Sequence, residues 1–206
     1  MAEAISLAKE LNDIHGLASA LGSAANLGQC GRNLGQVERF SSDLIELSTR
    51  HHFTQWMAIG AIYCTWARSA PGDSAEGIPG IEQGIRDLRT TGTVLGLPYY
   101  LALKAEAVYL VDRTSEALEA INEGEALAER LSSVWCFPDC TGIAVCFSRL
   151  LVLRRPKLRL RFCEAIRIAR EQKSILLEKC AEGTYAEYRR QKVSASEGRG
   201  FRLPLL

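Results

Sequence analysis

Apolar residues recur with helical spacing along most of the chain, and the pattern is clearest between Leu97 and Leu131. Each half of this segment has apolar side chains three and four residues apart, which form one stripe because a helical turn contains 3.6 residues. Polar residues at 112–115 interrupt the stripe, and Thr114 or Ser115 can cap a second helix. The pattern therefore predicts a helical hairpin. Such a pair cannot bury both faces alone, so it needs helical neighbours.

Five further segments upstream of this hairpin also predict helices, at 2–11, 17–28, 37–49, 55–68 and 78–88. The segment 55–68 is apolar nearly all round, which predicts that it is the most deeply buried of them. Turn-forming residues follow at 69–77 and separate it from the next helix.

Equivalent positions in these helices recur in steps of 40. The series Ala4, Leu44, Gly84 and Gly124 advances by 40 each time, and Ala165 follows after a step of 41. An ordinary helical bundle is the alternative interpretation, but it does not require helices to agree in register. We therefore predict an all-α fold, a right-handed solenoid of antiparallel helical hairpins with a period of about 40 residues.

The clearest hairpin resembles a tetratricopeptide repeat. Ala117, Ile121 and Gly124 give the small, large, small spacing of that repeat, and Ala105 is the small residue of the facing helix. The tripeptide 116–118, Glu-Ala-Leu, adds to the likeness. The period of about 40 differs from the 34 residues of the standard repeat, so the chain is similar to the longer, degenerate members.

Longer phrases resemble the C-terminal repeat region of large bacterial regulatory proteins. They include ALGSAANLGQCGR, GIEQGIRDLRTTG and EAIRIAREQ, and the resemblance covers about 1–131 and 162–206. In such proteins an adenylate or guanylate cyclase domain, or a winged-helix DNA-binding domain, precedes an ATPase module and then the repeats. This chain carries none of the cyclase, ATPase or DNA-binding motifs, so the resemblance implies no catalytic residue.

The expected domain organisation has four parts: helical repeats at 1–131, a pattern-breaking segment at 132–161, a terminal helical pair at 162–192 and a flexible tail at 193–206. The pattern-breaking segment has no helical stripe, and it combines prolines, cysteines and a run of arginines. A metal site built from its cysteines lacks a nearby histidine and a CxxC pair. A nucleic-acid surface is also disfavoured, because charge runs are more often solvated faces.

A frameshift within the gene is the hypothesis that we favour for 132–161. Residues 145–161 read one nucleotide earlier, with permitted codons, give the helical stretch GVFLAATGAAEAQIEAS, which runs into the helix at Phe162. Loss of one nucleotide near Ser133 and gain of one near Arg161 would produce the chain. A local conflict with an otherwise consistent pattern supports this hypothesis, which the nucleotide sequence of the gene tests.

Composition narrows the classes of partner. The 206 residues include 25 Lys and Arg and 24 Asp and Glu, a formal net charge of +1, so no global field favours nucleic acid or anionic lipid. No apolar run approaches the roughly 20 residues that span a bilayer. We expect a cytoplasmic protein with no membrane or nucleic-acid partner. Its seven cysteines are an odd number, and we interpret them as reduced thiols.

Candidate chemistry is sparse, and we predict no catalytic residue, metal site or cofactor. The histidines are His15, His51 and His52, and the last two suit a helix end better than a catalytic role. A partner-binding groove is the remaining candidate site, and its proposed residues are Trp56, Tyr63, Tyr99, Tyr100 and Lys104. For Trp56 and Tyr63, a place in the core is the preferred interpretation.

Together these features predict a noncatalytic protein-interaction or regulatory module that binds an unidentified protein or peptide on a concave surface of its first helices. The chain begins on what resembles the second helix of a repeat, which suggests a fragment or degenerate remnant of a larger signalling protein. The alternative is the regulatory region of a nucleotide cyclase or of an ATPase-linked transcriptional regulator. We do not expect an enzyme.

Overall fold

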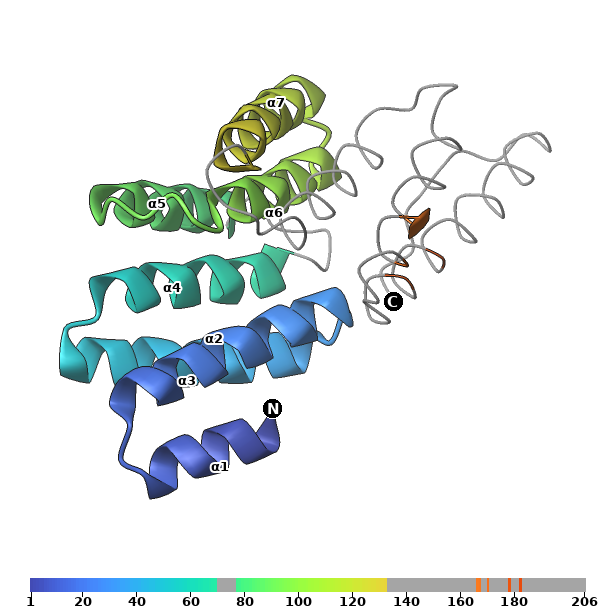
Figure 1. The fold of residues 1–206 in the computed structure, drawn as a ribbon. Coiled ribbons are helices and arrows are strands. Elements are labelled where there is room, and N and C mark those ends of the chain that lie inside the picture. The colour runs from blue at the N-terminus through green and yellow to red at the C-terminus, as the bar shows by residue number, and fades with distance from the viewer. Residues whose placement is uncertain (70–76, 133–165, 168–169, 171–177, 179–181, 183–206) are drawn as a thin grey trace.

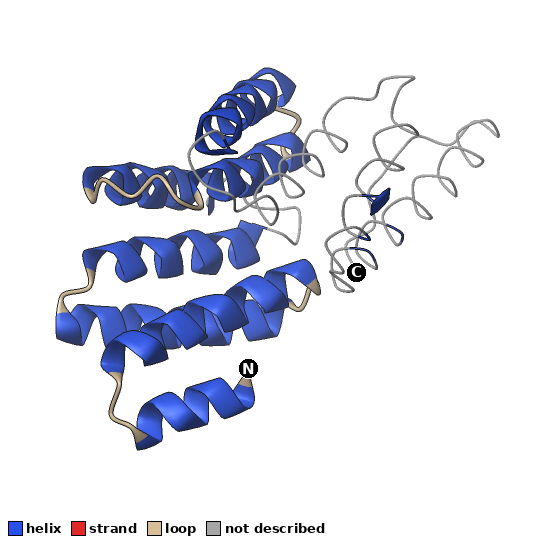
Figure 2. Cartoon of the chain, viewed as in Figure 1, coloured by secondary structure: helices blue, strands red, loops and turns tan. Residues whose placement is uncertain are grey.

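The structure, a computed structural model, describes residues 1–69, 77–132, 166, 167, 170, 178 and 182. The two long stretches form seven helices joined by short turns (Figure 1). These are α1 (Ala2–Glu10), α2 (Ile14–Cys30), α3 (Leu34–His51), α4 (Thr54–Ser69), α5 (Gly77–Thr90), α6 (Leu97–Leu110) and α7 (Thr114–Ser132). No strand occurs among the described residues (Figure 2). The all-α prediction is confirmed for this part of the chain.

Every helix predicted upstream of Ser132 is present, but α2 and α3 each begin three residues before the predicted start. Polar caps explain the difference. Asp13 Oδ1 accepts a hydrogen bond from the Gly16 amide at 2.9 Å, and Asn33 Oδ1 accepts one from the Gln36 amide at 3.1 Å. These caps satisfy amides that have no partner inside the helix, so the helix can start before its apolar stripe does.

The turns between helices recur along the chain in steps of 20 or 40. In each of the five described turns a residue has a left-handed backbone, with φ between 52° and 74°, at Asn12, Arg32, His52, Gly92 and Asp112, and Gly96 is a second such residue in the turn before α6. At four of these turns the amide of the following residue returns to a carbonyl five residues earlier, as in the Asn33 to Gly28 bond of 2.9 Å. This bond ends a helix with a sharp change of direction. A helix with its turn therefore takes up one step of 20, and a pair of helices accounts for the step of 40.

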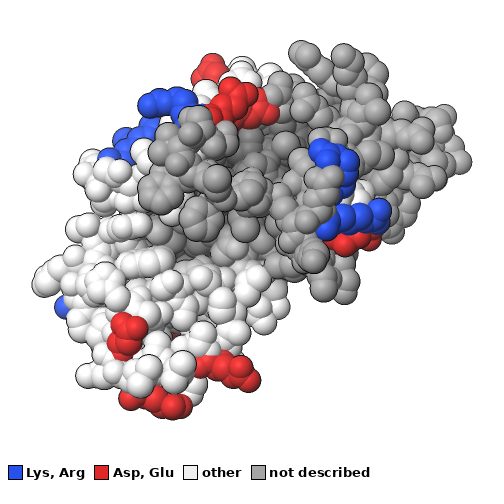
Figure 3. Space-filling model, in the orientation of Figure 1, with Lys and Arg blue, Asp and Glu red and all other residues white. Residues whose placement is uncertain are grey.

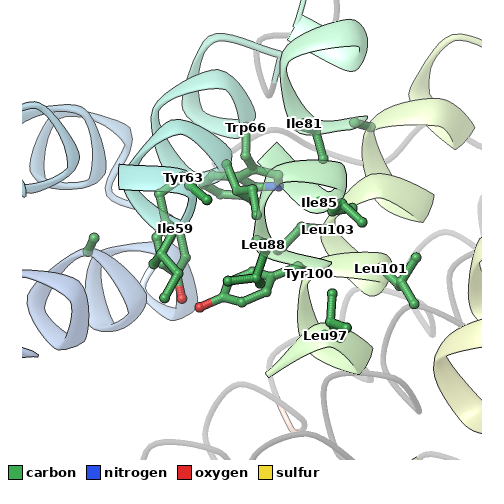
Figure 4. Packing of buried hydrophobic residues seen from close by; sticks show 14 of the residues in the cluster. Ile59, Tyr63, Trp66, Ile81, Ile85, Leu88, Leu97, Tyr100, Leu101 and Leu103 are labelled. Atoms are coloured by element: carbon green, nitrogen blue, oxygen red, sulfur yellow. The ribbon is translucent and has the colours of Figure 1, made fainter. Parts of the chain in front are cut away.

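The helices follow one another through the molecule in chain order, with α1 at one end and α7 near the other (Figure 1). Each packs on the next, and α4 also contacts both α2 and α6. The core runs along these contacts, with Trp66, Ile81 and Leu88 at most 1% exposed (Figure 4). The segment predicted to be deepest, now α4, is extensively buried, and α6 is buried to a similar extent.

Most of the C-terminal third lies outside the described residues. This applies to the pattern-breaking segment 132–161, of which only Ser132 is described, at the end of α7, and to the tail 193–206. Within 162–192 the five described residues are helical, and Arg170 pairs with Glu178 at 2.5 Å and with Glu182 at 2.7 Å. The frameshift hypothesis therefore remains a prediction. In the described part of the chain, no helix has the length and apolar character needed to cross a bilayer.

Candidate partner-binding site

Three tyrosines from two helices meet on the side of α4 that faces α6. Tyr63 lies in α4, and Tyr99 and Tyr100 lie in the first turn of α6, which begins after Gly96 with a proline at 98. The ring of Tyr63 is 6.4 Å from that of Tyr99 and 5.9 Å from that of Tyr100, centroid to centroid. Figure 4 shows the hydroxyls of Tyr63 and Tyr100 directed toward one another. We call Tyr63, Tyr99 and Tyr100 the tyrosine cluster.

Two amide side chains near the end of α2 bind the tyrosine cluster. Asn26 Nδ2 donates to the Tyr63 hydroxyl at 2.9 Å, and the Tyr99 hydroxyl donates to Gln29 Oε1. Burial raises the pKa of all three tyrosine hydroxyls well above the ordinary value of a phenol. The hydroxyls therefore stay protonated and hold α2, α4 and α6 together through hydrogen bonds.

A second set of three side chains links the turn after α2 to α4 and α6. Trp66 Nε1 in α4 donates to Glu106 Oε2 in α6 at 3.2 Å. Arg32, in the turn after α2, forms an ion pair with Glu106 Oε1, and its guanidinium lies 5.6 Å from the centroid of the Trp66 ring. This combines an ion pair with a cation–π contact. We call Arg32, Trp66 and Glu106 the cross-helix row.

The remaining predicted groove residues, Lys104 and Trp56, have partners outside the tyrosine cluster. Lys104 Nζ pairs with Glu82 Oε1 in α5 at 2.9 Å, and this hydrogen bond lowers the pKa of the Glu82 carboxyl below its ordinary value. Trp56 lies in the first turn of α4 and packs over Gly22 of α2, where an added Cβ would be 2.8 Å from Trp56 Cζ3. Trp56 is seven residues, about two helical turns, before Tyr63 in α4, and Lys104 is about one turn after Tyr100 in α6.

The five predicted groove residues differ in their exposure to solvent. Tyr63 and Tyr100 are buried, at 2% and 8% exposed, which agrees with the core interpretation preferred for Tyr63. Trp56, Tyr99 and Lys104 are partly exposed. A partner can therefore reach these three side chains, whereas the two buried tyrosines are out of its reach. The binding role of all five stays a prediction.

The described residues offer little for catalysis or metal binding. They contain no group of three or more His, Cys, Asp or Glu side chains placed to hold a metal ion. His15 and His51 stack on Phe53, with ring centroids 4.2 Å and 5.8 Å away, and His52 lies at the end of α3. Cys30 and Cys64 are free cysteines among the described residues, and Cys64 is buried in α4.

The comparisons with known proteins found nothing similar. No family model matches the chain, and no curated protein or solved structure does so. The resemblance to tetratricopeptide repeats and to bacterial regulatory proteins therefore stays a prediction.

The sequence analysis missed most of the polar residues that join the helices, namely Asn26, Gln29, Arg32 and Glu106. One signal could have found two of them. Asn26, Trp66 and Glu106 recur in steps of 40 along the chain, so they occupy the same position in successive repeats. Arg32 and Gln29 have no such signal. Arg32 lies in a turn, and Gln29 bonds to Tyr99, which is 70 positions away in the chain.

Proposed function

We propose that the chain is a noncatalytic protein-interaction module, a solenoid of tetratricopeptide-like hairpins that binds a peptide or helix on its first helices. The observation that supports this most is the direct contact of α4 with both α2 and α6, although other helices intervene in the chain. In the proposed solenoid α2, α4 and α6 are the first helices of successive hairpins. First helices that lie side by side form the continuous binding surface of helical-repeat proteins. The recurrence of Asn26, Trp66 and Glu106 in steps of 40 adds to it.

The proposed contacts are the partly exposed members of the predicted groove. Tyr99 has a partly exposed aromatic ring that loses little rotamer entropy on binding. Lys104 carries a positive charge that can leave Glu82 and pair with a carboxylate of the partner. The buried rings of Tyr63 and Tyr100 pack against that of Tyr99. The partner class is a helix or an extended peptide, the two forms that repeat surfaces bind.

Selection from a random peptide library displayed on phage, with the purified full chain as bait, tests this proposal. We expect enriched peptides whose binding is weakened at least about tenfold by Tyr99→Ala or Lys104→Glu. Lys9→Glu is the matched control, because Lys9 is an exposed cation in the last turn of α1, a helix that packs on α2. Failure to enrich peptides, or equal loss with the control variant, would contradict the proposal.

A further inference from the structure

The cross-helix row has the geometry of a cation-binding site. Trp66 of α4 and Glu106 of α6 form two sides of it, joined by the hydrogen bond from Trp66 Nε1 to Glu106 Oε2 at 3.2 Å. The other carboxylate oxygen, Oε1, pairs with the guanidinium of Arg32, whose Cζ lies 5.6 Å from the centroid of the Trp66 ring. An aromatic face beside a carboxylate binds an ammonium or guanidinium group through a cation–π contact and a charged hydrogen bond.

Glu106 differs from the other residues of the first helices in its charge. The helices α2 and α4 contain no Asp or Glu, and Glu106 is the acidic residue of α6. Its side chain is 12% exposed, so its attraction to a cation is screened little by water. The position also recurs, since Asn26, Trp66 and Glu106 follow one another in steps of 40. The two sides of the cation site therefore belong to the helices on which we propose that a peptide binds.

Arg32 is held less firmly than the two residues that surround its guanidinium. It lies in the turn between α2 and α3, and its side chain is 42% exposed. Trp66, by contrast, is 1% exposed and belongs to the hydrophobic core. The Arg32 side chain can rotate away about its own bonds without movement of a helix, which uncovers the face of the Trp66 ring and Glu106 Oε1. Another cation can then take its place.

The charges of the described helices favour a cation over an anion as the external ligand. Residues 1–69 and 77–132 contain 15 Asp and Glu but 10 Lys and Arg. In the view of Figure 3, the surface over α1–α4 shows several acidic side chains and few basic ones. A carboxylate brought to the site would lie beside Glu106 and be repelled, whereas a cation would be attracted.

We propose that Trp66 and Glu106 bind an arginine side chain of the partner peptide, which displaces Arg32. This inference rests on the proposed function and names the chemistry of the partner, a peptide that carries an arginine. A planar guanidinium can stack on the indole and pair with Glu106 Oε1, which a lysine ammonium cannot do in the same geometry. Exchange of one guanidinium for another changes the electrostatic energy of the site little. Arg32 is therefore an intramolecular competitor of the peptide, and its removal should tighten binding.

Titration with a small probe tests the site without the peptide. The isotope-labelled Arg32→Ala variant of the full chain is titrated with N-acetyl-arginine methylamide, and NMR follows the indole N–H signal of Trp66. We expect a saturable shift with a dissociation constant on the order of 10 mM, and at least about tenfold weaker binding to the wild type, where Arg32 fills the site. N-acetyl-citrulline methylamide, which has the same shape without the charge, is the matched control and should cause no saturable shift.

Two further variants show whether the response comes from this site. Arg32→Ala combined with Glu106→Gln should lose the response to the arginine probe. Arg50→Ala, which removes an exposed arginine of α3 from its own ion pair, should bind the probe no better than the wild type does. Arg32→Gln replaces Arg32→Ala if circular dichroism shows a loss of helix in the alanine variant. A folded Arg32 variant without a saturable shift, or one with an equal response to the citrulline probe, overturns the inference.

The peptides enriched by phage selection test the same site in the wild-type chain. We expect their affinity to fall at least about tenfold when their arginine is replaced by citrulline, and to rise at least about threefold in the Arg32→Ala variant. Enriched peptides that bind equally well without arginine, or that bind Arg32→Ala more weakly, overturn this inference and leave the proposed function intact. Failure of the selection contradicts the proposed function, whereas the small probe still decides whether the cation site exists.

Discussion

The residues at the left-handed turn positions are mostly not glycine. Asn12, Arg32, His52 and Asp112 adopt φ values between 52° and 61°, a region that costs an ordinary L-residue about 1–2 kcal/mol. Asn and Asp tolerate this backbone better, because their short polar side chains bond locally. Arg32 has a different reason to be there, since its side chain reaches Glu106 from this turn. The ion pair of Arg32 with Glu106 therefore offsets the free-energy cost of the left-handed backbone at Arg32.

The turn after α3 provides a test of that cost. We expect His52→Gly to raise the free energy of unfolding by about 0.5–1 kcal/mol, because glycine adopts the left-handed backbone without strain. The converse change, Gly92→Ala, should lower it by about 1 kcal/mol. An added Cβ at Gly92, where φ is +74°, would meet no atom within 4 Å, so the backbone alone is responsible. Urea denaturation measures both, and an unchanged Gly92→Ala variant would contradict the explanation.

The tyrosine cluster predicts a loss of stability at alkaline pH. Burial raises the pKa of Tyr63, Tyr99 and Tyr100 above the ordinary value of about 10. Above pH 10 the unfolded chain therefore loses protons that the folded chain retains, and the free energy of unfolding falls as pH rises, by up to about 1.4 kcal/mol per pH unit for each tyrosine. Below pH 10 both states keep these protons, so the cluster adds no pH dependence there.

Urea denaturation between about pH 8 and pH 11 measures this slope. Tyr100→Phe should make it shallower by the contribution of one group. Tyr109→Phe, a partly exposed tyrosine later in α6, is the control and leaves the cluster complete. Equal slopes for wild type and Tyr100→Phe would show that Tyr100 does not act in this way.

At the scale of the helices, glycines allow neighbouring elements to approach closely. A Cβ at Gly84 of α5 would lie 2.6 Å from Ile62 Cγ1 and 3.2 Å from the Ala58 carbonyl oxygen. A Cβ at Gly60 of α4 would lie 2.8 Å from Ile45 Cγ1. Helix propensity alone would make the glycines of α5 a weakness, whereas the packing shows their use at the contact of α4 with α5.

Gly84→Ala should therefore destabilise the protein although alanine favours the helix. We expect a loss of about 1–3 kcal/mol, because the methyl group forces α5 away from α4. Gly35→Ala is the matched control, since a Cβ there meets only Asn33 Oδ1 at 3.8 Å and the site is exposed. That variant should be unchanged or more stable by up to about 0.5 kcal/mol. Thermal melts compare the two, and a Gly84→Ala variant as stable as wild type would refute the close packing.

At the scale of the whole molecule, the cross-helix row joins elements that are far apart in the chain. Arg32 and Glu106 are separated by 74 residues in the chain. The ring of Trp66, which comes between them in the sequence, lies next to the Arg32 guanidinium. The Glu106 side chain is only 12% exposed, so its attraction to the guanidinium is screened less than that of a surface pair. The row therefore couples the region of α2 to α6 across α4.

A double-mutant cycle measures this coupling. Arg32→Ala and Glu106→Gln should show an interaction energy of about 1 kcal/mol. The control cycle uses Arg50→Ala and Glu46→Gln, an ion pair within α3 whose side chains are 68% and 64% exposed. We expect about 0.3–0.5 kcal/mol for that pair. A control coupling as large as the first would mean that the row contributes no more than a surface ion pair does.

Local patterns in the sequence were enough to predict the helices. Each apolar stripe is set by residues within a few turns of one another, and the register of Ala4, Leu44, Gly84 and Gly124 depends only on counting along the chain. The predicted starts of α2 and α3 were wrong by three residues, because caps such as Asp13 act outside the apolar stripe. The candidate groove was less predictable, because the burial of Tyr100 and the partial exposure of Tyr99, neighbours in the chain, depend on packing between helices.

The sequence by itself therefore determined the helical class, the order of the helices and the step of 40, all of which follow from interactions between residues close in the chain. Only the tertiary structure decided that Tyr63 meets Tyr99 and that Arg32 meets Glu106. Such contacts depend on the angle and distance between helices, which arise from side-chain packing over the whole core and are not encoded in any one stripe.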